Sequence, residues 1–220
     1  MSKPIIICDF DGTITNNDNI IAIMKKFAPP EWNALKDDVL SQRISVRAGV
    51  EKMFQLIPSE LKFDIIQYLL FTAQLRDGFR EFVQYTEEEE IPLYIVSGGI
   101  DFFVHPLLNG LVDRDRVYCN AGDFSGQAIE ILWPNSCDDQ CSNDCGCCKP
   151  SLIRKLAAPD QEVIVIGDSV TDLEAAKLAD FVFARDFLLG KCQSLDLPHQ
   201  EFTTFFDVID RLKKKQEAVS

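Results

Sequence analysis

Three short, mostly apolar runs stand out along the chain, and each one ends at polar or glycine residues. They cover residues 5–8, 91–96 and 162–166. A run of about four to eight apolar residues is typical of a strand buried on both faces, as in a parallel sheet. The pattern therefore predicts three buried parallel strands.

Between the first two runs, the apolar positions change to a helical spacing. This spacing is found in four segments, at residues 20–27, 31–40, 46–56 and 59–75. Proline or polar residues separate these segments, as expected where helices end. The chain therefore predicts a core of residues 1–15 and 78–220, interrupted by a helical insert of residues 16–77.

Two aspartates, Asp9 and Asp11, directly follow the first strand. On an extended chain, residues two apart point to the same side. The carboxyl ends of parallel strands form the crevice where open α/β sheets bind ligands. Because two close carboxylates repel each other, the pair indicates a bound cation between them. An acidic turn after a strand is the alternative explanation of this motif alone.

Polar groups also follow the other two strands. Ser97 and Gly98 offer a hydroxyl and an exposed backbone N–H, which suit a phosphate, although the same residues are common in turns. Asp168 and Asp172 follow the third strand. Lys149 lies between the second and third strands, ahead of a helical stretch. A single lysine is ordinarily a solvated charge, so its place in the order of motifs is what makes it a candidate.

The order Asp-x-Asp-Gly-Thr, Ser, Lys and Gly-Asp-x-x-x-Asp resembles the haloacid dehalogenase superfamily. The resemblance implies an α/β fold with a Rossmann-like parallel sheet core flanked by helices, and a small helical-bundle cap inserted after the first strand. It also implies a phosphoric monoester hydrolase. Asp9 would be the nucleophile that forms an aspartyl-phosphate. Asp11 would be the general acid and then the general base.

The same resemblance implies the remaining roles at the site. Ser97, Gly98 and Lys149 would hold the phosphoryl oxygens. Asp168 would bind Mg²⁺ together with the Asp9 carboxylate and the backbone carbonyl of Asp11. Asp172 would orient Lys149 or a metal-bound water. A hard cation such as Mg²⁺ suits this chemistry, because it offsets the repulsion between a carboxylate and a phosphate dianion.

The helical insert resembles the cap of the phosphoserine phosphatase branch of this superfamily. Lys52 falls where those phosphatases place an arginine that binds the substrate. Arg43 and Arg47 are competing candidates, and exposed basic residues are also common on helices without a ligand role. We therefore expect a basic residue of the insert to contact the substrate.

Five cysteines lie within twelve residues, immediately before Lys149. They are Cys137, Cys141, Cys145, Cys147 and Cys148. Disulfides are disfavoured in the cytosol. Zinc bound by three or four thiolates and free or redox-active thiols remain two open explanations, because the spacing matches no common zinc knuckle. The isolated Cys8, Cys119 and Cys192 are expected to be small buried residues.

This cysteine loop, with Cys-Asp-Phe-Asp-Gly-Thr-Ile-Thr and Phe-Ala-Pro-Pro-Glu-Trp, resembles the phosphatases of bacterial methionine salvage. The resemblance implies a phosphorylated methylthiopentenyl intermediate as the substrate. Phosphoserine or another small phosphomonoester is the alternative with the same chemistry. A different class of function is a metal or redox sensor, in which the cysteine loop is the functional element and the phosphatase core is a scaffold.

Composition and net charge limit the kinds of partner that the chain is expected to bind. The chain has 220 residues and a net charge of −13, which disfavours binding to nucleic acid or to an anionic membrane. No segment approaches the roughly 20 apolar residues of a membrane span. A strand directly at the N-terminus, without the pattern of a signal peptide, predicts a cytoplasmic location. We expect a small phosphorylated substrate as the partner, and the sequence carries no signal of an oligomeric state.

Overall fold

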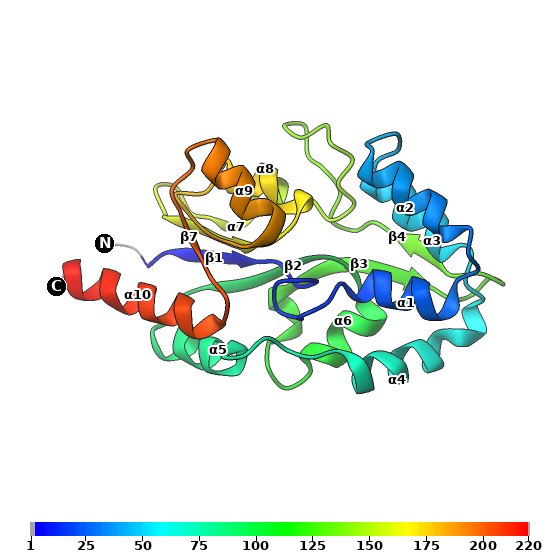
Figure 1. Ribbon diagram of the computed structural model, residues 1–220. Coiled ribbons are helices and arrows are strands. Elements are labelled where there is room, and N and C mark those ends of the chain that lie inside the picture. The colour runs from blue at the N-terminus through cyan, green and yellow to red at the C-terminus, as the bar shows by residue number, and fades with distance from the viewer. Residues whose placement is uncertain (1–2, 220) are drawn as a thin grey trace.

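The computed structural model describes residues 3–219 and has a seven-stranded sheet at its centre (Figure 1). The strand order is β4-β3-β2-β1-β5-β6-β7. The bounds are β1 (Ile5–Cys8), β2 (Leu93–Ile100), β3 (Val117–Asp123), β4 (Glu130–Leu132), β5 (Val163–Gly167), β6 (Phe181–Ala184) and β7 (His199–Glu201). Every neighbouring pair is parallel except β3 and β4. The predicted α/β fold with a parallel sheet is confirmed.

Helices cover both faces of this sheet (Figure 1). One layer contains α5 (Phe79–Glu88), α6 (Asp101–Leu108) and α10 (Phe205–Val219), and the other contains α7 (Lys149–Leu156), α8 (Leu173–Ala176) and α9 (Asp186–Ser194). The alternation of side chains along a strand explains the two layers. In β1, Ile6 and Cys8 belong to the larger core, whereas Ile5 and Ile7 pack with residues of α7.

The helices of the insert follow β1, near the positions expected from the apolar spacing. They are α1 (Asn19–Phe27), α2 (Trp32–Leu40), α3 (Val46–Phe54) and α4 (Lys62–Thr72), with a short 3₁₀ helix, η1 (Ser59–Leu61), before α4. The side chains of Asp18 and Ser45 cap α1 and α3 by accepting backbone hydrogen bonds. The last segment is shorter than expected, because the backbone of Ala73 is already extended.

The topology places the site. β1 lies between β2 and β5. The sheet extends from β1 through β2 to β4 on one side and through β5 to β7 on the other. The carboxyl ends of these three strands therefore meet at the point where open α/β sheets bind ligands. Across residues 3–219, no helix is long and apolar enough to pass through a bilayer.

Candidate active site

A buried lysine between two carboxylates is the centre of the site. Lys149 is the first residue of α7, and its Nζ lies 2.8 Å from Asp9 Oδ1 and 2.7 Å from Asp172 Oδ1. All three side chains are almost fully buried. Burial opposes the charge of the ammonium, but Asp172 and Asp9 outweigh it and raise the pKa of Lys149. Lys149 is therefore a fixed positive charge beside Asp9.

Asp172 is held by the turn that follows β5. It ends the 3₁₀ helix η3 (Val170–Asp172), and its Oδ2 accepts hydrogen bonds from the backbone N–H groups of Asp168, at 3.1 Å, and Ser169, at 3.0 Å. A Cβ atom on Gly167 would lie 2.7 Å from this oxygen, so the turn needs glycine there. These contacts leave Oδ1 of Asp172 to form the ion pair with Lys149.

Asp168 is positioned by the loop after β1. The hydroxyl of Thr13 donates a hydrogen bond of 2.7 Å to Asp168 Oδ1. The buried Arg76 supports this loop, since its guanidinium donates to the carbonyls of Thr13 and Gly12, each at 2.7 Å. Thr13 belongs to the Asp-x-Asp-Gly-Thr motif that the sequence analysis identified. Arg76 was missed by the sequence analysis, because its contacts join positions more than sixty residues apart.

The tight turn at Gly12 gives a first testable prediction. Gly12 has a φ of 80°, and a Cβ atom there would lie 2.4 Å from Asp168 Oδ2. Gly12→Ala should therefore displace Asp168 and lower kcat by roughly 10-fold or more, in addition to about 1–2 kcal/mol of backbone strain. Steady-state kinetics and urea unfolding would measure the two effects.

Gly110→Ala is the matched control for this prediction. Gly110 has a φ of 74°, but its added Cβ atom would meet no heavy atom within 4 Å. This variant should lose a similar amount of stability and keep its kcat. Equal loss of activity in both variants would contradict the proposed role of the contact between Gly12 and Asp168.

Asp11 faces a different partner from Asp9. Its Oδ1 accepts hydrogen bonds from the side-chain amide of Asn19, at 2.7 Å, and from the Asn19 backbone, at 3.0 Å. Burial, together with the negative charge of Asp18, raises the pKa of Asp11 to about 7. A carboxyl group with such a pKa can both donate and accept a proton near neutral pH. Asn19 is a second positioning residue that the sequence analysis missed.

The end of β2 lies beside Asp11. Ser97 is buried, and its Oγ accepts a hydrogen bond of 2.9 Å from the backbone of Gly99. A Cβ atom on Gly99 would lie 2.9 Å from Ser97 Oγ and 3.0 Å from Asp11 Oδ2. The carbonyl of the neighbouring Gly98 accepts from Asn120 at 2.8 Å, and an added Cβ atom at Gly98 would meet only open space. The polar groups of Asp11, after β1, and Ser97, near the end of β2, therefore lie close together.

The carboxylates of this site suit a hard cation. Among residues 3–219, Asp9, Asp168 and Asp172 each offer one carboxylate oxygen, and these three atoms all lie within 4.8 Å of one another. Three carboxylates face one ammonium, so the site carries excess negative charge. Accordingly, burial and the neighbouring Asp172 raise the pKa of Asp9 and bring that of Asp168 to about 6. Oxygen donors in an electronegative site are the preference of Mg²⁺.

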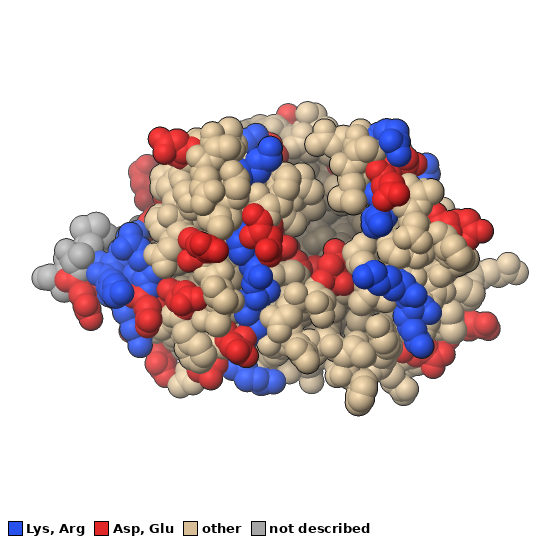
Figure 2. All heavy atoms as spheres, viewed as in Figure 1, with Lys and Arg blue, Asp and Glu red and all other residues tan. Residues whose placement is uncertain are grey.

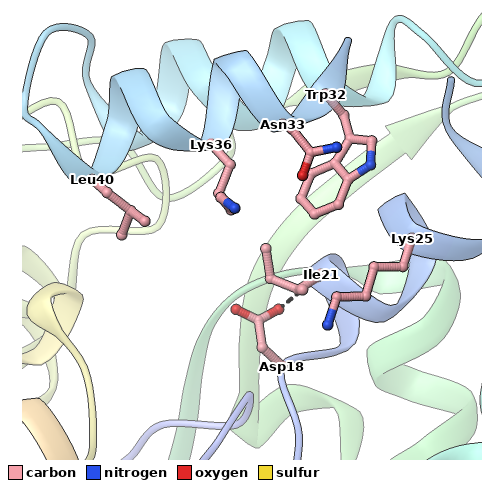
Figure 3. Close-up of a pocket in the computed structure, with 7 residues that line it drawn as sticks. All are labelled: Asp18, Ile21, Lys25, Trp32, Asn33, Lys36 and Leu40. Carbon is pink, nitrogen blue, oxygen red and sulfur yellow. Dashed lines mark hydrogen bonds between the residues drawn. The ribbon is translucent and has the colours of Figure 1, made fainter. Parts of the chain in front are cut away.

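A cavity of about 580 Å³ opens between α1 and α2, next to this site (Figure 3). It is lined by Asp18, Ile21, Lys25, Trp32, Asn33, Lys36 and Leu40. Figure 2 shows a hollow in the middle of this face of the molecule, between the helical insert and the core helices. Asp18 links the cavity to the active site, because it neighbours Asn19, which holds Asp11. The cavity has the size of a small-molecule site.

The basic residues of this cavity differ from the expected ones. Lys25 and Lys36 line it, whereas Lys52, Arg43 and Arg47 do not. Arg43 forms an ion pair of 2.6 Å with Asp38, and Lys52 is exposed on α3. Arg47 contacts Asp144 at 3.5 Å and stacks over Trp133, outside the insert. The helical spacing predicted the helices but not which of their side chains line this cavity.

The cysteine loop separates into two parts. The sulfur atoms of Cys137, Cys141, Cys145 and Cys148 all lie within 4.8 Å of one another. Cys147 is not in this group, since its Sγ points to the carbonyl of Tyr118 at 3.7 Å and is buried against the sheet. Cys8, Cys119 and Cys192 are buried, as the sequence predicts for isolated cysteines.

Comparison with protein families decides the assignment. The family model of the haloacid dehalogenase-like hydrolases matches residues 6–177. The chain belongs to this family. The matched residues include every predicted catalytic and phosphate-binding residue, and the match confirms the predicted superfamily and the predicted hydrolase class.

Two relatives are similar in sequence to this haloacid dehalogenase-like hydrolase along nearly its whole length. Both are named 2-hydroxy-3-keto-5-methylthiopentenyl-1-phosphate phosphatase. The one from Geobacillus thermodenitrificans is 67% identical over 97% of this chain and 98% of its own length. The one from Geobacillus kaustophilus is 65% identical over the full length of both chains.

A solved structure of a substrate-bound phosphoserine phosphatase complex has the same fold. It superposes with a TM-score of 0.72 over 96% of this chain and 99% of the other, at 16% identity. At this identity the likeness concerns the arrangement of helices and strands alone.

Proposed function

We propose that the chain hydrolyses 2-hydroxy-3-keto-5-methylthiopentenyl-1-phosphate in methionine salvage, with Asp9 as the nucleophile. The observation that carries this proposal is the buried Lys149, held between Asp9 and Asp172 in a chain 65–67% identical to phosphatases named for that substrate. The lysine provides positive charge beside the attacking carboxylate. A phosphate dianion needs this charge to approach Asp9.

The first step transfers the phosphoryl group to the enzyme. A carboxylate oxygen of Asp9 forms a bond to phosphorus while the bond between phosphorus and the substrate's ester oxygen breaks. Asp11 protonates that leaving oxygen, in keeping with its pKa of about 7. Lys149, Ser97 and the backbone N–H of Gly98 stabilise the charge on the remaining phosphoryl oxygens. The products are the dephosphorylated substrate and an aspartyl-phosphate.

The second step releases inorganic phosphate. Asp11, now a carboxylate, takes a proton from a water molecule, whose oxygen attacks phosphorus as the bond to Asp9 breaks. Asn19 keeps Asp11 oriented in both steps through its two hydrogen bonds. The step returns Asp9 as a carboxylate and Asp11 as an acid, so the enzyme is ready for another substrate.

Asp9, Asp168 and the backbone carbonyl of Asp11 would hold Mg²⁺ at this site. The bound ion would neutralise the repulsion between Asp9 and the phosphate and stabilise the developing charge. Asp172 holds the lysine instead, because its Oδ1 forms the ion pair with Lys149 and its Oδ2 accepts two backbone hydrogen bonds.

Residues 16–77 act as the cap that selects the substrate, over the core formed by residues 1–15 and 78–220. The cavity between α1 and α2 combines apolar side chains, such as Ile21, Trp32 and Leu40, with the ammonium groups of Lys25 and Lys36. The apolar part suits a methylthio tail, and the lysines suit the keto and hydroxyl oxygens of the same molecule.

Initial rates of phosphate release from this substrate and from phosphoserine would test the proposal. With Mg²⁺ present, kcat/KM should be roughly 10²-fold higher or more for the methylthiopentenyl phosphate, because phosphoserine lacks the apolar tail and carries a charged ammonium group. EDTA should remove the activity. Equal rates on the two substrates would contradict the substrate assignment, and full activity in EDTA would contradict the magnesium site.

Two leucine variants connect this selectivity to the cavity. Leu40 lines the cavity, whereas Leu70 lies on α4 outside it, and both are more than half exposed. Leu40→Ala should raise KM for the methylthiopentenyl phosphate roughly 3- to 10-fold, and Leu70→Ala should not change it. An unchanged KM in both variants would contradict the assignment of the methylthio tail to this cavity.

A further inference from the structure

Four thiols come together in the loop between β4 and α7. The sulfur atoms of Cys137, Cys141, Cys145 and Cys148 all lie within 4.8 Å of one another, and those of Cys141 and Cys145 are 3.9 Å apart. In tetrahedral zinc sites with Zn–S bonds of about 2.3 Å, neighbouring sulfur atoms are about 3.8 Å apart. A disulfide would require about 2.0 Å. The spacing therefore suits four ligands around one ion.

We propose that these four cysteines bind one Zn²⁺ as a closed tetrathiolate site, separate from the carboxylate site of catalysis. Soft thiolate ligands favour zinc, whereas Mg²⁺ prefers oxygen. Four protein ligands leave no open position for water or substrate, so the site is structural. The fifth cysteine of the loop, Cys147, is directed to the carbonyl of Tyr118 and takes no part.

The backbone of the loop is shaped to bring the four thiols together. Asp144 has a φ of 50° and Gly146 has a φ of 81°, so the chain turns sharply on both sides of Cys145. Gly146 also packs closely against Trp133, where a Cβ atom would lie 2.7 Å from the indole ring. Such turns cost conformational energy, which an ion that cross-links Cys145 to the rest of the loop would offset.

Side-chain contacts tie this loop to α7 at Asp138, which pairs with Arg154, and to α3 at Asp144, which pairs with Arg47, but not at Cys145. Among the described residues, 137–148 form neither a helix nor a strand. The loop's backbone hydrogen bonds are few: Cys141 donates to the carbonyl of Asp138 at 3.1 Å, and Cys148 donates to the carbonyl of Asn135 at 2.8 Å. The loop also lies at the surface rather than in a core, because Cys137, Cys141 and Cys145 are partly exposed. Metal binding is a common source of stability for such segments.

The zinc site joins parts of the molecule that matter for catalysis. Cys148 directly precedes Lys149, and Ser151 of α7 donates a hydrogen bond of 3.0 Å to Cys148 Sγ. On the other side, Ser45 at the start of α3 donates to Asp144 Oδ2 at 2.6 Å. In Figure 1 the loop (yellow-green, top) stands between α8 of the core and α2 and α3 of the insert. The ion therefore stabilises the link between the start of α7 and the helical insert.

Metal analysis of the purified chain tests this site. The wild type, purified under reducing conditions, should contain one zinc per chain, and Cys145→Ser should lose it. Cys147→Ser is the matched control from the same loop and should retain it. Zinc-free wild type that contains disulfides would overturn the proposal. Loss of zinc from Cys147→Ser as well as Cys145→Ser would overturn this set of ligands.

Cobalt binding by the metal-free, reduced wild type provides a second measurement that needs no variant. Titration with Co²⁺ should produce thiolate charge-transfer absorption and the visible bands of a tetrahedral complex, saturating at one equivalent. Zn²⁺ should displace the cobalt and remove these bands. The absence of tetrahedral thiolate bands would overturn the proposal even if the purified protein contained some zinc.

Discussion

Asp9→Asn should abolish phosphate release, with a loss in kcat of roughly 10⁴-fold or more. The amide has nearly the same shape as the carboxylate but cannot attack phosphorus. Asp9 is 4% exposed, and the contact of its Oδ1 with Lys149, at 2.8 Å, holds the side chain in place. Steady-state phosphate release by the purified variant would measure the loss.

The fold should survive this substitution. Lys149 keeps its contact of 2.7 Å with Asp172, and burial already raises the pKa of Asp9, which means that the site disfavours its charge. The melting temperature of Asp9→Asn should therefore equal or exceed that of the wild type. Asp210→Asn, at an exposed position on α10, is the control and should leave kcat unchanged. Activity of Asp9→Asn above a tenth of the wild type would contradict the role of Asp9 as the nucleophile.

Lys149→Met should damage both activity and stability. Removing the ammonium leaves the buried carboxylates of Asp9 and Asp172 without their positive partner. Breaking a buried ion pair from one side costs about 3–5 kcal/mol of unfolding free energy. Loss of its charge at the phosphoryl oxygens should lower kcat by roughly 10²- to 10³-fold. Urea unfolding and steady-state kinetics on the same preparation would give both values.

Lys155→Met is the control for Lys149→Met. It shows whether the losses of activity and stability come from Lys149 itself or from general damage to α7. Lys155 lies on the same helix but is exposed. Its replacement should change the unfolding free energy by less than about 1 kcal/mol and leave kcat near the wild-type value. If Lys149→Met kept wild-type stability, the ion pairs with Asp9 and Asp172 would not exist in the folded protein.

Three of the seven strands, β1, β2 and β5, and most of the candidate site residues could be predicted from the sequence, because their signals are local. A buried strand is a continuous apolar run. Asp9 and Asp168 directly follow strand ends, and Ser97 lies among the last four residues of β2. Parallel strands then bring these ends together, whatever lies between them in the sequence. The catalytic roles themselves came from the family resemblance.

Residues that support the site could not be predicted in the same way. Arg76 contacts the loop after β1 only because the insert returns the chain to that place. Likewise, Lys25 and Lys36 line the cavity because of how α1 and α2 face each other, which helical spacing does not specify. The cysteines show the same limit, since only the folded loop separates Cys147 from the other four.

The most direct test of the account is to identify the residue that carries the phosphoryl group. In Asp11→Asn, an aryl phosphate with a good leaving group should still phosphorylate the enzyme, while loss of the general base slows release of phosphate. Acid quenching and peptide mass spectrometry should then find one phosphoryl group, on Asp9. A phosphoryl group on another residue, or turnover without any covalent intermediate, would contradict the proposed mechanism.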